Sequence, residues 1–236
     1  IVKYLNMTPA EKVKFISNWI KTYVDEMPNK AQSLVIGISG GIDSSVSSTL
    51  SAMTGLKTIV LSMPIKQKEN QHDLSLKHQD WLVKKFENVE AHTISLDKLF
   101  DTFSSTLNKF DTEHGFANSR ARLRMTTLYQ VAAANKGIVV GTGNKVEDFG
   151  VGFYTKYGDG GVDISPIADC NKTEVWELGK ELGILKEIID APPTDGLWDD
   201  GRTDEGQLGF KYSDLEDAMT NPDSPHKLQY EKIRKQ

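Results

Sequence analysis

The sequence predicts an α/β fold, with a doubly wound, mostly parallel sheet flanked by helices. Three observations support this prediction. Short apolar runs rich in β-branched residues recur along the chain, as in strands that are buried on both faces. Segments with helical periodicity lie between these runs, and this strand–helix–strand order implies right-handed crossovers. The length of 236 residues suits one large α/β domain, with or without a small appendage.

The first expected elements are a helix, a strand and a second helix. The segment Thr8-Pro9-Ala10-Glu11 has the pattern of a capping box with proline at the first helical position. One face of the helix that follows carries the apolar residues Val13, Ile16, Ile20, Val24 and Met27. Residues 33–38 are predicted to form the first buried strand, and residues 44–54 the helix after it.

Three further strands are expected at residues 58–62, 89–94 and 137–141, with helices at residues 71–86 and 117–135 between them. Beyond Gly141 the pattern changes, because residues 149–163 contain five glycines and little periodicity. A segment of this length without regular structure is typically functional or mobile. Helices are expected again at residues 172–182 and 213–220, and residues 195–209 are predicted to form a loop.

The composition excludes several classes of protein. The formal net charge of −5 argues against a general nucleic-acid binder. No apolar run approaches the ~20 residues that a membrane helix needs, and the N-terminus lacks the pattern of a signal peptide. Cys170 is the only cysteine, which rules out an internal disulfide and a cysteine-based zinc cluster. We therefore expect a cytoplasmic protein, and a C-terminal tail that is incomplete at Gln236.

The segment Ser39-Gly40-Gly41-Ile42-Asp43-Ser44 lies between the first predicted strand and its helix. Two glycines allow the backbone to turn tightly and to approach a ligand closely. The helix that follows presents free N–H groups and the positive end of its dipole, and serine hydroxyls add donors. This combination predicts a site for phosphate oxygens.

Two well-known phosphate loops do not fit this segment. The Walker pattern requires a lysine at its end, and the dinucleotide pattern requires a third glycine where this chain has Ser44. Asp43 would repel phosphate unless a cation lay between them, and Mg²⁺ suits that position. The plain alternative is a strand–turn–helix junction with an aspartate cap.

The same segment resembles the pyrophosphate loop of the N-type ATP pyrophosphatases, which include NAD, GMP and asparagine synthetases. Further segments look like the NAD synthetase family in particular. They are Arg122–Met125, Gly141–Glu147, Thr155–Asp163, Lys172–Val175, Pro193–Leu197, Asp204-Glu205, Leu208-Gly209 and Tyr212. This resemblance implies a Rossmann-like, adenine nucleotide alpha hydrolase-like fold, with residues 1–236 forming a single domain.

The resemblance also implies a reaction: ATP adenylates the nicotinate carboxylate of deamido-NAD and releases pyrophosphate, and ammonia then displaces AMP to give NAD. The residues implied to bind ATP are Ser39, Gly40, Gly41, Ile42, Asp43, Ser44, Ser45, Thr142, Lys172 and Thr194. Those implied for Mg²⁺ are Asp43 and Glu147, and those for deamido-NAD are Arg122, Lys156 and Asp163. The residues implied for catalysis are Asp159, Asp163 and Lys172, with Asp159 near the incoming ammonium.

Free ammonia is the expected nitrogen source, because the chain lacks the length and the cysteine of a fused glutaminase domain. The resemblance implies a homodimer with the dinucleotide site at the subunit interface. Two alternatives stay open. One is another N-type ATP pyrophosphatase, either tRNA-modifying or purine-amidating, and the other is a non-catalytic nucleotide-binding protein. Arg122, Lys156, Asp159 and Asp163 could also be ordinary surface charges.

Overall fold

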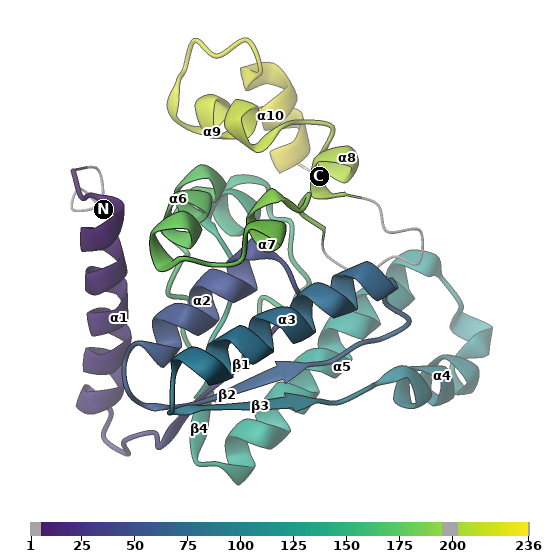
Figure 1. Cartoon of the computed structure of the whole chain (residues 1–236). Coiled ribbons are helices and arrows are strands. Elements are labelled where there is room, and N and C mark those ends of the chain that lie inside the picture. Colours follow the sequence, from purple (N-terminus) through teal and green to yellow (C-terminus); the bar gives the residue numbers. More distant parts are fainter. Residues whose placement is uncertain (1–5, 195–202, 236) are drawn as a thin grey trace.

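The computed structural model describes residues 6–194 and 203–235 and contains a parallel sheet of four strands in the order β3-β2-β1-β4 (Figure 1). The strands are β1 (Ser33–Gly37), β2 (Lys57–Ser62), β3 (Val89–Thr93) and β4 (Gly137–Val139). All three strand pairs are parallel, as the sequence predicts. β2 and β4 lie on opposite sides of β1. The order in which strands are added to the sheet therefore reverses between β1 and β4. In doubly wound folds, ligands bind at this switch point.

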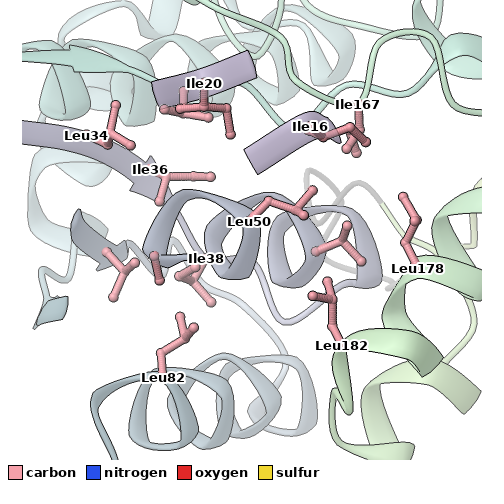
Figure 2. Close-up of a cluster of buried hydrophobic side chains, with 14 of the residues drawn as sticks. Ile16, Ile20, Leu34, Ile36, Ile38, Leu50, Leu82, Ile167, Leu178 and Leu182 are labelled. Atoms are coloured by element: carbon pink, nitrogen blue, oxygen red, sulfur yellow. The ribbon is translucent and has the colours of Figure 1, made fainter. Parts of the chain in front are cut away.

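Alternate residues of β1 enter two different cores, which confirms the doubly wound arrangement. Leu34 and Ile36 pack with α1 (Pro9–Glu26), α2 (Ile42–Ala52), α3 (Glu69–Lys85) and α6 (Lys172–Leu182). Figure 2 shows this cluster, in which Ile16, Leu50 and Leu178 come from three of those helices. Val35 faces the other side of the sheet, toward α4 (Asp97–Thr106) and α5 (Glu113–Ala134).

A third, smaller cluster joins the C-terminal helices to the segment that follows β4. Its elements are η2, a π-helical turn (Val146–Val151), with α8 (Asp204–Leu208), α9 (Tyr212–Thr220) and α10 (Lys227–Arg234). The remaining elements are η1 (Asn108–Phe110) and α7 (Lys186–Asp190). In Figure 1, α8 to α10 lie together beyond α6 and α7. The C-terminal part of the chain is thereby packed close to the end of the sheet where ligands are expected.

Most predicted elements are confirmed, with boundaries shifted by a few residues. Thr8 is the N-cap of α1, and the reciprocal bonds of the capping box join it to Glu11. The expectation of a loop over residues 195–209 is wrong for residues 204–208, which form α8; residues 195–202 lie outside the described part. Helices α4, α7 and α10 were not predicted. No helix in the described ranges combines the length and apolar character needed to cross a membrane.

Candidate functional site

The turn between β1 and α2 has a backbone shape that depends on glycine. Gly40 has φ +92°, in the left-handed region, and a Cβ built there would lie 2.6 Å from the carbonyl oxygen of Gln71. Glycine therefore allows both the turn and the close approach of α3. Gly41 is the N-cap of α2 and has no side chain to cap the first amides. Amide N–H groups at this helix start are thus available to an anionic ligand.

Serine hydroxyls fix the shape of this turn. The Oγ atoms of Ser39 and Ser44 lie 3.1 Å apart, and the amide of Gly41 donates to Ser39 Oγ over 3.2 Å. Ser44 Oγ also accepts from the amide of Ser39 at 3.2 Å. The turn is thereby organised by its own side chains before any ligand arrives.

A cavity of about 370 Å³ opens beyond the carboxyl ends of the strands. Its volume is in the range of small-molecule sites. Its wall brings together residues from β1, α2, α3, α5, η2 and α6. The predicted site residues that line it are Ser39, Gly40, Gly41, Ile42, Asp43, Ser44, Thr142, Glu147, Asp159, Lys172 and Thr194.

A buried ammonium lies between two carboxylates at this cavity. Lys172 Nζ is 2.6 Å from Asp43 Oδ2 and 3.1 Å from Glu147 Oε1, and the lysine side chain is only 3% exposed. Lys172 is the first residue of α6, Asp43 lies in the first turn of α2, and Glu147 lies in η2. Three segments that are distant in the sequence thus place one positive and two negative groups at the wall of the cavity.

Burial and neighbouring charge shift the pKa values of this trio. Burial acts to lower the pKa of Lys172, but the carboxylates of Asp43 and Glu147 raise it above its ordinary value, so the ammonium stays charged. Burial raises the pKa of Asp43 to about 6, although Lys172 acts to lower it. One ammonium does not fully offset two buried carboxylates. Further positive charge at this place would be stabilising.

A second layer of hydrogen bonds holds the two carboxylates in place. Asn144 Nδ2 donates to Asp43 Oδ2 at 3.2 Å, and Asn144 Oδ1 accepts from the amides of Val146 and Glu147. The hydroxyl of Tyr212 donates to Glu147 Oε1 at 2.6 Å. Asn144 is fully buried, so its amide links the two acidic segments rigidly.

The position of Lys172 depends on how the start of α6 is anchored. Asn171 and Glu174 form a capping box, and Lys12 of α1 donates to Glu174 Oε1 at 2.7 Å. Glu216 of α9 accepts from both the amide and the hydroxyl of Thr173, at 3.0 and 2.6 Å. Helices from the two ends of the chain therefore clamp the turn that carries Lys172.

The carboxylate pair fits a divalent cation such as Mg²⁺. Asp43 Oδ1 is buried and makes no hydrogen bond with any described residue. Among the described residues, no group of three or more His, Cys, Asp and Glu side chains is arranged to hold a metal ion. Mg²⁺ commonly takes one or two carboxylates and completes its shell with phosphate oxygens and water. Asp43 and Glu147 offer this smaller set of ligands.

Two further acidic side chains, Asp148 and Asp159, lie at the wall of the same cavity. Burial raises the pKa of Asp148 to about 7, and the carboxylates of Glu147, Asp159 and Asp43 act in the same direction. Its carboxylate lies directly over Gly143, where a Cβ would come within 2.1 Å of Oδ2. Asp159 accepts a hydrogen bond from the amide of Thr155 at 2.8 Å. A cationic or protonated group would be favoured beside this wall.

Four predicted site residues lie outside the cavity lining. The hydroxyl of Ser45 points to the carbonyl oxygen of Gly41, at 2.8 Å. Arg122 and Lys156 are exposed, and Arg122 Nε donates to the carbonyl oxygen of Lys156 at 3.0 Å. Asp163 accepts from the amide of Val139 at 2.7 Å and from the hydroxyl of Tyr129 at 3.1 Å. The residues expected to bind deamido-NAD thus lie in α5 or in contact with it, outside the lining of the cavity.

Sequence reasoning assigned no role to Asn144, Asp148 or Tyr212. Asn144 and Tyr212 stand in segments that carry the family resemblance, but nothing in their spacing shows which partners they meet. Asp148 directly follows Glu147, and only the π-helical turn brings both carboxylates to one cavity. The only signal for Asp148 in the sequence was that it is a carboxylate next to Glu147, an expected metal ligand.

Comparisons with known proteins agree with this geometry. A family model described as NAD synthase matches residues 12–236. A protein named NH(3)-dependent NAD(+) synthetase from Carboxydothermus hydrogenoformans is 38% identical over 213 residues, which is 87% of this chain and 83% of that protein.

Two solved structures have the same fold. The structure of NMN synthetase from Francisella tularensis matches with a TM-score of 0.89 and 34% identity, covering 98% of this chain and 94% of that one. The NH3-dependent NAD synthetase from Campylobacter jejuni matches with a TM-score of 0.77 and 25% identity, covering 97% of this chain and 94% of that one. The cavity, its phosphate-type turn and these matches together show that the chain belongs to the NAD synthase family.

Proposed function

We propose that this protein amidates the nicotinate carboxylate of deamido-NAD, using ATP and ammonia, and releases AMP and pyrophosphate. The observation that carries the proposal is the buried trio of Lys172, Asp43 and Glu147 beside the serine–glycine turn, in a chain of the NAD synthase family. The name of the Carboxydothermus relative supports the same reaction.

In the first step, the turn holds the triphosphate of ATP. Its glycine amides and the hydroxyls of Ser39 and Ser44 suit phosphate oxygens. Asp43 and Glu147 would hold Mg²⁺, which when bound neutralises charge on the phosphates. Thr142 and Thr194 line the same cavity and supply further polar contacts to ATP.

The adenylation step brings two anions together. A nicotinate carboxylate oxygen attacks the α-phosphorus, and the bond from that phosphorus to the pyrophosphate oxygen breaks. Lys172 is charged and fixed before the reaction, so it can offset the negative charge that gathers in the transition state. No proton transfer is required in this step.

In the second step, ammonia attacks the acyl carbon of the adenylate, and the bond to the AMP oxygen breaks. Ammonium must lose one proton before it attacks, for which a nearby carboxylate is a suitable acceptor, and the bound nitrogen releases a second proton to solvent as the amide forms. Asp159 lines the cavity and is our candidate for this role. Arg122, Lys156 and Asp163 would contact the dinucleotide, with Asp163 also orienting the reacting ring.

We also propose a homodimer in which the dinucleotide site is completed by the second subunit. Arg122 and Lys156 are exposed and lie apart from the main cavity, which is consistent with a site shared between subunits. Light scattering at assay concentrations tests this proposal, and a strictly monomeric, active protein would contradict it.

A second candidate substrate is nicotinate mononucleotide. The match to NMN synthetase has the higher TM-score and identity of the two solved structures, 0.89 and 34% against 0.77 and 25%. Forming NMN requires the same adenylation and amidation, but on a substrate that lacks the AMP half of deamido-NAD. The trio and the turn serve either substrate equally, so only the dinucleotide contacts separate them.

The experiment is a product assay with ATP, Mg²⁺ and ammonium, using deamido-NAD or nicotinate mononucleotide as the acceptor. A higher kcat/KM for deamido-NAD supports the main proposal, and a higher value for the mononucleotide supports the second. AMP and pyrophosphate must appear in equal amounts with the amide; formation of ADP would refute both. Glutamine in place of ammonium should give no product.

Asp43→Asn should abolish Mg²⁺-dependent turnover, because it removes a charged candidate ligand. The matched control is Asp80→Asn, since Asp80 forms an exposed pair with Lys84 on α3, outside the cavity lining. If both variants kept full activity, the assignment of Asp43 would fail.

A further inference from the structure

Tyr212 brings the C-terminal helices into contact with the reactive trio. It is the first residue of α9 and is 1% exposed, and it packs in the cluster that contains Val146 and Leu215. The edge-to-face ring of Trp176 lies 6.0 Å away. These contacts give the tyrosine ring little freedom to move.

The hydroxyl of Tyr212 has acidic groups as its polar neighbours. It lies 2.6 Å from Glu147 Oε1 and 3.3 Å from Asp204 Oδ2. Burial and the carboxylates of Glu147 and Asp204 raise the pKa of Tyr212 well above its ordinary value, so the hydroxyl keeps its proton. A hydroxyl has one proton to donate, and the shorter contact directs it to Glu147.

The ring of Tyr212 also contacts the cation of the trio. Lys172 Nζ lies 5.0 Å from the ring centroid, within the range of a cation–π contact. The same Glu147 oxygen accepts from Lys172 Nζ and from the Tyr212 hydroxyl. One side chain therefore restrains both a candidate metal ligand and the lysine expected at the phosphates.

We propose that Tyr212 is a positioning residue that holds Glu147 in the orientation needed to bind the divalent cation. The test of this inference by enzyme kinetics rests on the proposed function, whereas its test by ATP binding does not. Removing the hydroxyl frees Glu147 to rotate and leaves Lys172, within residues 6–194 and 203–235, as the remaining hydrogen-bond donor to its carboxylate. Outer partners of metal ligands typically change metal affinity or activity by about 10–100-fold.

The test uses Tyr212→Phe, which keeps the ring, its packing and its contact with Lys172. The matched control is Tyr230→Phe, because Tyr230 is buried in the same cluster but lies against Lys227 instead of the trio. ATP binding is measured by calorimetry with Mg²⁺ and, separately, with EDTA. For Tyr212→Phe we expect the Kd for ATP to rise about tenfold with Mg²⁺ and to stay unchanged with EDTA.

The Mg²⁺ concentration for half-maximal pyrophosphate release should rise by a similar factor, with the rate recovering at high Mg²⁺. A purely structural role would lower the melting temperature and weaken ATP binding equally in both buffers, and that result would overturn the inference. So would a Tyr212→Phe protein indistinguishable from Tyr230→Phe. If the unaltered protein makes neither NAD nor NMN, the proposed function fails, whereas the calorimetric comparison still decides the role of Tyr212.

Discussion

Replacing Lys172 by methionine tests whether the buried trio is an electrostatic unit. The change removes the ammonium but keeps most of the side-chain volume, so Asp43 and Glu147 lose their shared cation. Breaking a buried ion pair on one side costs about 3–5 kcal/mol, because the remaining charge stays desolvated. A protein of this size loses about 2–4 °C in Tm per kcal/mol, so we expect a decrease in Tm of about 10 °C at neutral pH.

The control for this change is Lys77→Met. Lys77 Nζ lies 2.6 Å from Glu187 Oε2, the same distance that joins Lys172 to Asp43, but its side chain is 52% exposed. Exposed ion pairs contribute little to stability, so the Tm of this variant should stay near that of the unaltered protein. The comparison therefore isolates burial as the cause.

Two further measurements sharpen the test. Mg²⁺ should raise the Tm of Lys172→Met more than that of the unaltered protein, because the ion supplies the missing positive charge. Lower pH should also reduce the difference between the two proteins. Burial already raises the pKa of Asp43 to about 6 in the unaltered protein, and loss of the ammonium should raise it further. The folded variant therefore keeps Asp43 protonated at low pH, and the loss of stability appears only as pH rises through that pKa. Equal melting of Lys172→Met and Lys77→Met at neutral pH would refute the reasoning.

Two other changes probe the fold around the site. Burial lowers the pKa of His78 to about 4, so its stabilising contribution is complete above pH 6.5 and is lost as pH falls toward 4. At about 1.4 kcal/mol per pH unit, the free energy of unfolding should fall by about 3 kcal/mol over this range. His78→Gln should abolish this decrease in denaturant unfolding measured against pH, and an unchanged profile would contradict the reasoning. Gly40→Ala should destabilise by about 1–3 kcal/mol and weaken ATP binding, because it combines φ +92° with a 2.6 Å clash against Gln71. Gly55→Ala is its control, since Gly55 also has positive φ but nothing within 4 Å of its Cβ position, and equal losses in the two would rule out the clash.

The sheet was predictable because its strands are marked by composition. Residues 58–62 and 137–139 are β-branched or apolar at nearly every position, as burial on both faces requires. Helix α4 was not predicted although Leu99, Phe100 and Phe103 give it an apolar face; it has only 10 residues, a length at which helix formation depends on packing, and Phe100 is its only buried residue. Helix α10 likewise buries only Tyr230. Their packing depends on partners that local sequence does not reveal.

The site was predictable to different degrees. The serine–glycine turn is a local feature, and its shape follows from Gly40 and the serine hydroxyls. The family resemblance named Asp43, Glu147 and Lys172, but their meeting at 2.6 and 3.1 Å results from packing α6 against α1 and α2. The contact of Tyr212 with Glu147 spans 65 residues, so no local pattern could indicate it.

The clamp on α6 also affects the order in which this protein matures during synthesis. Lys12, which binds Glu174, is translated before α6. Glu216, which accepts hydrogen bonds from Thr173, is translated 43 residues after Thr173. A nascent chain can therefore build the sheet and the serine–glycine turn before the last anchor of Lys172 exists. Full anchoring of Lys172 therefore has to wait until α9 has been synthesised and has folded beside α6.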